Sequence, residues 1–161
     1  MMRGFLAAAL ALLCSASGAL AEKVMDRIEI NATADAVWAA IGDFCGIQNW
    51  HPAVASCEVE SDGKARIRTV ILKDGGKLVE KEINRNNLGR AYSYKGVETP
   101  LPVEHYAATI KVLPIGKTKV NVLWMSAFKP IGPGAAAEKS VSDLYVAGLK
   151  GLKAKIETPA R

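Results

Sequence analysis

The segment Trp50-His51-Pro52 holds an imidazole between an indole and a proline. A proline restricts the preceding residue to extended backbone, so we expect a helix to end at His51 and a strand to follow. A titratable ring at such a junction could bind the polar end of an apolar ligand. The alternative is a structural histidine that caps the helix or hydrogen-bonds a carbonyl group.

A second group of candidate residues lies in the segment Lys77–Ile83. If Lys81 faces solvent, the alternation of a strand turns Leu78, Glu80 and Glu82 inward. Two carboxylates on a core face are unusual, so one of them is a candidate cavity acid. The alternative is a carboxylate at the cavity mouth that pairs with a nearby lysine or arginine.

Alternation also assigns faces to the later strands. With Lys95, Lys111 and Lys119 in solvent, most of the aromatic side chains turn inward and His105 lies outside. The inward set is Tyr92, Tyr94, Tyr106, Ala108, Ile110, Val112, Val120, Val122, Trp124 and Phe128.

The segment Arg66–Leu72 is assigned by the same rule. If its two arginines face solvent, the side chains of Ile67, Thr69 and Ile71 point into the core.

A series of short elements must position these residues. Alternation predicts a strand over Val24–Ile30, and Asn31 or Thr33 is expected to cap a short helix after it. A second short helix or turn is expected over Phe44–Trp50. Six strands follow, separated by Gly-, Asp-, Asn- and Pro-containing turns: Cys57–Glu60, Arg66–Leu72, Lys77–Ile83, Arg90–Gly96, His105–Leu113 and Lys119–Phe128. Connections this short imply an antiparallel meander.

The chain closes with a helical period over Ala135–Glu157. Its apolar stripe contains Val141, Leu144, Tyr145, Gly148, Leu149 and Leu152. We expect this helix to lie across the concave face of the curved sheet, so that helix and sheet enclose a cavity. The fold class is therefore α+β.

The N-terminus is typical of a signal peptide. A basic start precedes the apolar run Phe5–Leu13, which is too short to span a bilayer, and Ala19-Leu20-Ala21 is a cleavage pattern. Residues 1–21 are therefore predicted to be removed, leaving a single domain over 22–161 that is periplasmic or secreted, without a stable membrane span. A lipidated Cys14 is the alternative, but Leu13 is bulky where lipidation requires a small residue.

Composition narrows the function. The net charge of +5 comes from singly scattered basic residues, which gives nucleic-acid binding no support. Cys45 and Cys57 lie on either side of the Trp50-His51-Pro52 corner and could form a disulfide in an oxidising compartment, or remain buried thiols. No Cys/His spacing matches a zinc site, and neither a metal nor a cofactor is expected.

The order of elements matches the helix-grip fold, and several motifs carry a resemblance to a family. They are Trp50-His51-Pro52 with Ser56-Cys57-Glu58, Glu80, Tyr92-Ser93-Tyr94, Pro100-Leu101-Pro102-Val103, Tyr106 and Tyr145-x-x-Gly148-Leu149-x-x-Leu152. On these residues the chain resembles the START-like, Bet v 1-like superfamily (SRPBCC), which includes polyketide cyclases, dehydrases and lipid transport proteins. An exported domain of this length looks most like the MxaD-type accessory proteins of bacterial methanol oxidation.

The resemblance implies a ligand-binding set. A lysine and a glutamate in the pocket of plant abscisic-acid receptors fall at His51 and Glu80, and a pocket tyrosine falls at Tyr106. Trp124 stands where those receptors have a second acidic residue, so hormone recognition does not transfer. The implied ligand-binding residues are His51, Glu80, Tyr92, Tyr94, Tyr106, Trp124, Leu144 and Gly148.

Two classes of function follow. The favoured one is a non-catalytic protein that binds a hydrophobic or amphipathic small molecule, assists methanol dehydrogenase and its c-type cytochrome, or both. Its interior is then either an open pocket, or filled by side chains so that only protein interaction remains. The other is a cyclase-like enzyme that uses cavity His, Glu and Tyr side chains, although no nucleophile, base and orienting group stand together in the sequence. In the binding hypothesis, His51 lies within reach of Glu80 or a tyrosine, and its protonation strengthens binding of an anion.

Overall fold

The computed structural model describes residues 21–61, 63 and 65–158. The predicted signal segment therefore lies outside the described residues, except for Ala21. The elements, in chain order, are β1 (Glu22–Ile30), α1 (Ala34–Ile41), the 3-10 helix η1 (Gly46–Asn49), β2 (Val54–Ser61), β3 (Arg66–Leu72), β4 (Lys77–Asn86), β5 (Ala91–Glu98), β6 (Val103–Gly116), β7 (Lys119–Pro130) and α2 (Gly134–Glu157).

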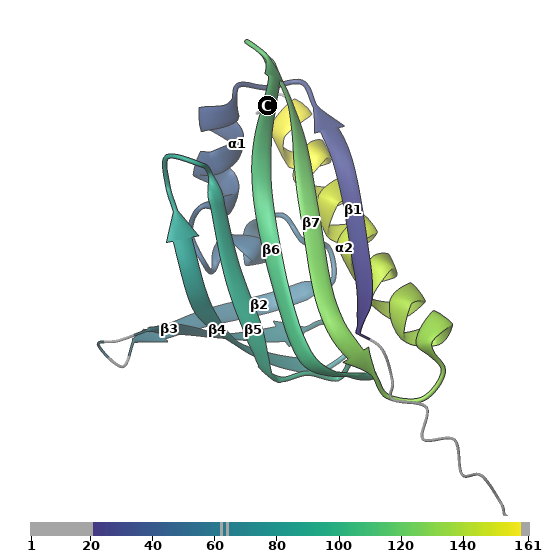
Figure 1. Ribbon diagram of the computed structural model, residues 1–161. Coiled ribbons are helices and arrows are strands. Elements are labelled where there is room, and N and C mark those ends of the chain that lie inside the picture. The colour runs from purple at the N-terminus through teal and green to yellow at the C-terminus, as the bar shows by residue number, and fades with distance from the viewer. Residues whose placement is uncertain (1–20, 62, 64, 159–161) are drawn as a thin grey trace, which may run out of the picture.

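The seven strands form one antiparallel sheet in the order β1-β7-β6-β5-β4-β3-β2. Figure 1 shows the sheet curving, with β2 and β3 crossing below the long strands β6 and β7 while α2 runs behind β1 and β7. The helix-grip architecture and the α+β class expected from the sequence are confirmed. No helix in the described part of the chain combines the length and apolarity needed to cross a bilayer.

The helix α2 packs through one stripe. Its buried residues are Ala137, Val141, Tyr145, Gly148, Leu149 and Leu152, and Leu144 is half-buried. The spacing of three and four places these residues on the side that faces the sheet. At the other helix, Thr33 is the N-cap of α1, because its Oγ1 accepts a hydrogen bond from the amide of Ala36 at 3.2 Å.

A disulfide joins Cys45, beside η1, to Cys57 in β2, with the two Cα atoms 5.4 Å apart. The bridge closes the segment that contains the Trp50-His51-Pro52 corner. The interpretation of the two cysteines as a pair, rather than as free thiols, is therefore the one that the structure supports.

The assigned faces are correct in most strands. Tyr92, Tyr94, Tyr106 and Trp124 are buried, and His105 is exposed.

The assignment of β3 is wrong. Arg68 and Val70 face the core, with 1% and 2% exposure, while Ile67, Thr69 and Ile71 are only half-buried. The cause lies in the neighbouring strand, because β4 sets Glu80 directly opposite Arg68. A buried carboxylate requires a cationic partner, and that partner is Arg68.

Candidate functional site

The space between the sheet and α2 contains a cavity of only about 20 Å³. Six of the eight expected ligand-binding residues line it: His51, Glu80, Tyr94, Tyr106, Trp124 and Leu144. A cavity of this size holds about one water molecule, whereas sites for small molecules measure roughly 300–1,000 Å³. The residues expected to meet a ligand therefore meet one another.

The other two expected residues lie beside the cavity. Tyr92 packs edge-on against Phe44, with the ring centroids 5.7 Å apart. Gly148 lies against the rings of His51 and Trp124.

An ion pair between Arg68 and Glu80 occupies the centre of the site. Arg68 Nε donates a hydrogen bond to Glu80 Oε2 at 2.6 Å, and Nη1 donates to the carbonyl of Phe44 at 2.6 Å. The guanidinium also lies over the rings of Phe44 and Tyr94, 4.3 and 4.8 Å from their centroids. Burial by itself lowers the pKa of Arg68, but the charge and hydrogen bond of Glu80 act together with the neighbouring Tyr92 and Tyr94 to outweigh burial, so the pKa is raised. The arginine is therefore a fixed cation, and Glu80 is already paired.

The aromatic residues form a second network. Trp124 Nε1 donates to the hydroxyl of Tyr94 at 2.8 Å, and the hydroxyls of Tyr106 and Tyr145 share a hydrogen bond. The rings of Trp124 and Tyr145 stack, with centroids 4.4 Å apart. Burial raises the pKa of Tyr94, Tyr106 and Tyr145, so these phenols stay protonated at neutral pH.

His51 lies at the cavity, but its hydrogen bonds differ from the expected ones. Its Nε2 lies 3.0 Å from the carbonyl oxygen of Leu144 in α2, and its Nδ1 accepts from the amide of Ala53 at 3.2 Å. Since Nδ1 accepts, the neutral ring donates through Nε2, and no hydrogen bond reaches Glu80 or a tyrosine. Burial lowers the pKa of His51, the bond to Leu144 opposes this, and the charge of Arg68 adds to the lowering. The expected anion binding by a protonated His51 is therefore not supported.

Two glycines of α2 make room for the corner. A Cβ added to Gly148 would lie 2.5 Å from His51 Cδ2, and one added to Gly151 would overlap the carbonyl oxygen of Trp50. The Trp50-His51-Pro52 corner therefore sits in a notch of the helix. This motif therefore anchors the segment between η1 and β2 to α2.

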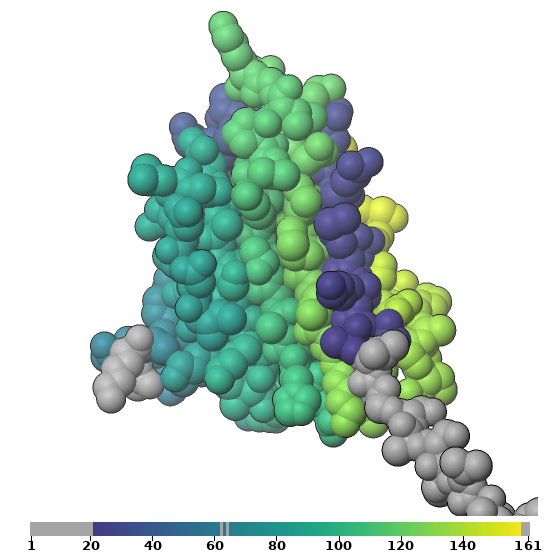
Figure 2. Space-filling view, viewed as in Figure 1, coloured from purple at the N-terminus to yellow at the C-terminus, as the bar shows by residue number. Residues whose placement is uncertain are grey.

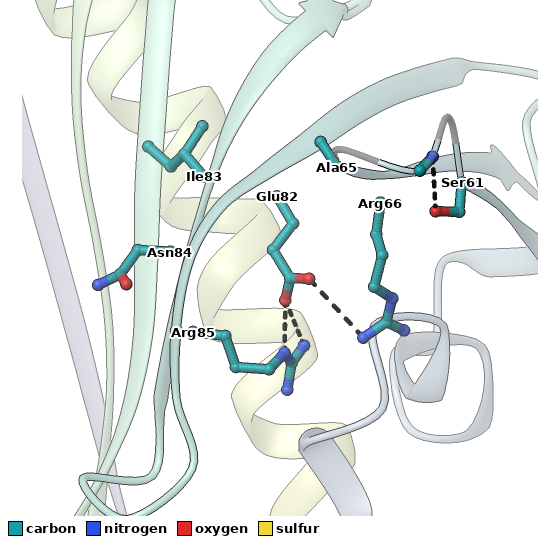
Figure 3. A pocket seen from close by; sticks show the side chains of 8 residues that line it. Ser61, Ala65, Arg66, Glu82, Ile83, Asn84 and Arg85 are labelled. Carbon is teal, nitrogen blue, oxygen red and sulfur yellow. Dashed lines mark hydrogen bonds and ion pairs between the residues drawn. The ribbon is translucent and has the colours of Figure 1, made fainter.

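A wider hollow of about 330 Å³ opens at the surface beside β3 and β4. Figure 3 shows Arg66 and Arg85 pointing toward the carboxylate of Glu82. Arg85 Nε donates to Glu82 Oε1 at 2.6 Å, and Arg66 Nη1 lies 3.7 Å from Glu82 Oε2. Arg66 also lies 3.5 Å from Asp43. Because these charges pair with one another, neither Arg66 nor Arg85 is a free cation for a ligand of this hollow.

The arrangement supplies little chemistry of its own. The one carboxylate that lines the cavity is ion-paired, and the imidazole is held by backbone groups. The phenols keep their protons at neutral pH and therefore cannot act as general bases. Among the described residues, no three His, Cys, Asp or Glu side chains converge as a metal site. Arg68 is the residue that sequence reasoning missed, and the inward-facing Glu80 on the neighbouring strand was the signal that could have found it.

The fold and the helix-covered sheet define a START-like, Bet v 1-like domain. The chain belongs to the family of polyketide cyclases/dehydrases and lipid transport proteins, whose model matches residues 21–157. A comparison with curated proteins found no match.

Solved structures share this fold. An uncharacterised protein from Bacillus thuringiensis is 27% identical, with a TM-score of 0.80 over 85% of this chain and 100% of that one. The protein XoxI from Bacillus cereus is 26% identical, with a TM-score of 0.78 over 83% of this chain and 94% of that one. The ZhuI aromatase/cyclase from Streptomyces sp. R1128 is 16% identical, with a TM-score of 0.72 over 86% and 94% of the two chains, a likeness of fold alone.

Proposed function

We propose that this protein is a non-catalytic accessory protein that acts through its surface. The observation that carries the proposal is the closed interior, where a cavity of about 20 Å³ is surrounded by side chains that bond to one another. A close-packed interior of this kind supports the fold and leaves no room for a substrate. Since one fold hosts many functions, membership of a family that includes cyclases does not by itself make the chain an enzyme.

The cyclase alternative is weaker on the same geometry. A general base needs a pKa near the working pH and a free route to its substrate. Glu80 is ion-paired to Arg68, and His51 uses both ring nitrogens for backbone contacts. Neither group is available to a substrate unless the interior rearranges.

We propose further that the mature domain is exported and assists a periplasmic redox system, as MxaD-type proteins do with methanol dehydrogenase and its c-type cytochrome. The signal-like residues 1–21 and the Cys45–Cys57 disulfide favour an oxidising compartment. The resemblance to MxaD-type proteins supplies the redox partners.

Reconstitution tests this proposal. The purified protein is added in increasing amounts to methanol dehydrogenase and its c-type cytochrome, and cytochrome reduction is followed by absorbance. We expect the rate to rise and to level off near one equivalent of protein, with no methanol oxidation by the protein alone. An unchanged rate contradicts the redox role, and turnover by the protein alone contradicts the non-catalytic role.

A small amphipathic ligand is the second candidate. The six expected residues that surround one cavity favour it, because they combine an apolar lining with a few polar groups. The cavity must then widen more than tenfold to reach the usual size of a ligand site. A ligand that copurifies with the protein would support this candidate over the closed scaffold.

A further inference from the structure

The outer face of the sheet, turned away from α2, carries a hollow that is separate from the closed interior. Figure 2 shows β1, β7, β6 and β5 side by side on this face with no other element over them. A trough of about 590 Å³ crosses these strands. Its outward-pointing side chains are Lys23, Met25, Ile83, Ser93, Ala107, Thr109, Met125 and Ala127, and we call this set the outer trough.

The outer trough has a small-residue floor and apolar walls. Strand pairing sets Met25 beside Met125 and Ala127 beside Ala107. Met25 and Ile83 rise from the floor with 64% and 54% exposure. A second hollow of about 520 Å³ continues past Ile83 to Val97, which is 63% exposed. Exposed apolar surface of this extent marks a site of interaction with another molecule.

Cations surround this apolar centre. In one row across the strands, Lys23 pairs in register with Ala127, and Lys95 pairs with Ala107. Two outward-facing rows further along the strands, past the row of Met25 and Met125, Arg27 and Lys111 are the register partners of Leu123. None of these four cations makes an ion pair within the described part of the chain.

Three carboxylates on the same strands pair with lysines outside this rim, and Glu98 in β5 lies 2.9 Å from Lys77. Glu29 lies 2.8 Å from Lys119, and Glu104 lies 3.4 Å from Lys129. The rim therefore presents unpaired positive charge around a recessed apolar centre.

We propose that the outer trough is the docking surface for an acidic protein, which inserts an apolar side chain between Met25 and Ile83 and sets carboxylates against Lys23, Arg27, Lys95 and Lys111. The inference deepens the proposed accessory function, on which it rests. Complementary charges at a rim raise the association rate and orient the partner, while a buried apolar anchor supplies affinity.

Two other occupants fit less well. A second copy of the chain meeting this face through the same face would set these cations against one another, and like charges across an interface are unfavourable. An anionic membrane suits the charge, but membrane binding requires apolar groups that project into the bilayer. Met25 and Ile83 project from this face, but the floor between them is made of the short side chains Ala107, Thr109 and Ala127, a hollow that a protruding side chain of a protein fills and a flat bilayer surface leaves uncovered.

Photo-cross-linking in the cells that make the protein tests the inference. The full chain carries p-benzoylphenylalanine at Met25, and a matched control carries it at Leu88, which is 94% exposed and outside the outer trough. Each label is combined with a rim variant (Lys23→Glu, Arg27→Glu, Lys95→Glu, Lys111→Glu) or with a variant of equal net charge (Lys73→Glu, Lys117→Glu, Lys150→Glu, Lys155→Glu). Where the rim variant does not reach the thermal midpoint of its counterpart, Lys23→Glu with Lys95→Glu replaces it, against Lys73→Glu with Lys150→Glu.

We expect a protein adduct at position 25 whose cross-linked peptide is rich in Asp and Glu. Its yield should fall at least tenfold in the rim variant and stay unchanged in the variant of equal net charge. The inference is overturned by an adduct no stronger than at position 88, by an adduct with a second copy or a lipid, by a peptide that is not acidic, or by equal yields in the two charge variants. If the partner is acidic but not a redox protein, the docking surface stands and the methanol dehydrogenase assignment fails.

Discussion

The two faces of one sheet differ in how their polar groups are used. On the inner face, Arg68 is bonded to Glu80 and Trp124 to Tyr94, and the remaining space holds about one water molecule. On the outer face, Lys23 and Lys95 flank a trough of about 590 Å³ and have no ion-pair partner among the described residues. Paired groups have no bonding capacity left, whereas unpaired charges around a hollow remain available to another molecule. The difference places the internally bonded polar groups inside the sheet and the unpaired charges outside.

The largest effect should come from breaking the buried ion pair. Arg68→Met leaves the carboxylate of Glu80 buried without its cation, and we expect a loss of about 3–5 kcal/mol in the free energy of unfolding. The double variant Arg68→Met with Glu80→Leu should recover most of that loss, because neither charge remains. Urea unfolding with the disulfide intact measures both variants. A single-variant loss under about 1 kcal/mol would mean that water reaches the pair and that the interior is open.

Removal of a core side chain of α2 should come next. Leu149 is 2% exposed, so Leu149→Ala should lower the free energy of unfolding by about 2–5 kcal/mol. The matched control is Lys150→Ala, one position along the same helix and exposed, for which we expect a change within about 0.5 kcal/mol. Equal effects for the two variants would show that α2 does not pack through the stripe described above.

A pH effect should follow from His51. Burial lowers the pKa of its ring in the folded chain, whereas the unfolded chain keeps the ordinary value of about 6.5. Between these two values the unfolded chain binds more protons. The contribution of His51 to the free energy of unfolding is therefore fully present above about pH 7 and is lost as the pH drops below about 6.5.

The variant His51→Gln should flatten this part of the curve. Unfolding measured from pH 7.5 to 5 gives the comparison, and the slopes of the two proteins are compared because the substitution also changes stability at every pH. Parallel curves for wild type and variant would mean that His51 is not held neutral by the fold.

The smallest effect is expected on the outer face. Met25 is 64% exposed, so Met25→Ala should change the free energy of unfolding by no more than about 0.5 kcal/mol. The same substitution should weaken partner binding if the outer trough is a docking surface. A stability loss as large as that of Leu149→Ala would remove the contrast between the two faces.

Much of the fold could be predicted because each element repeats one pattern. Alternation and turn residues gave the strands, and the apolar stripe of Val141, Tyr145 and Leu149 gave the helix. In β3, apolar residues occupy both phases of the alternation, and the rule that arginines face solvent selected the wrong one. Which face of β3 points into the core is decided by the pairing of Arg68 with Glu80 on the adjacent strand β4. The sequence of β3 alone does not contain this information.

The site was harder to predict than the fold. The sequence predicted which residues surround the cavity, among them His51, Glu80 and Tyr106. It did not predict that the cavity is closed, because its volume depends on how side chains from several strands and α2 pack together. Nor did it predict the contact between the corner and α2. That contact depends on two residues without a Cβ atom, because Gly148 faces the ring of His51 and Gly151 faces the backbone of Trp50.

Native mass spectrometry of protein purified from its own cells tests the closed interior most directly. For a closed interior we expect a single species with the mass of the mature chain from Glu22, less the two hydrogens lost in the Cys45–Cys57 bridge, and with no bound small molecule. Denaturation before the measurement should leave that mass unchanged. A second species that carries a small molecule under native conditions, and loses it on denaturation, would contradict a closed interior, because the interior would then open to admit a ligand.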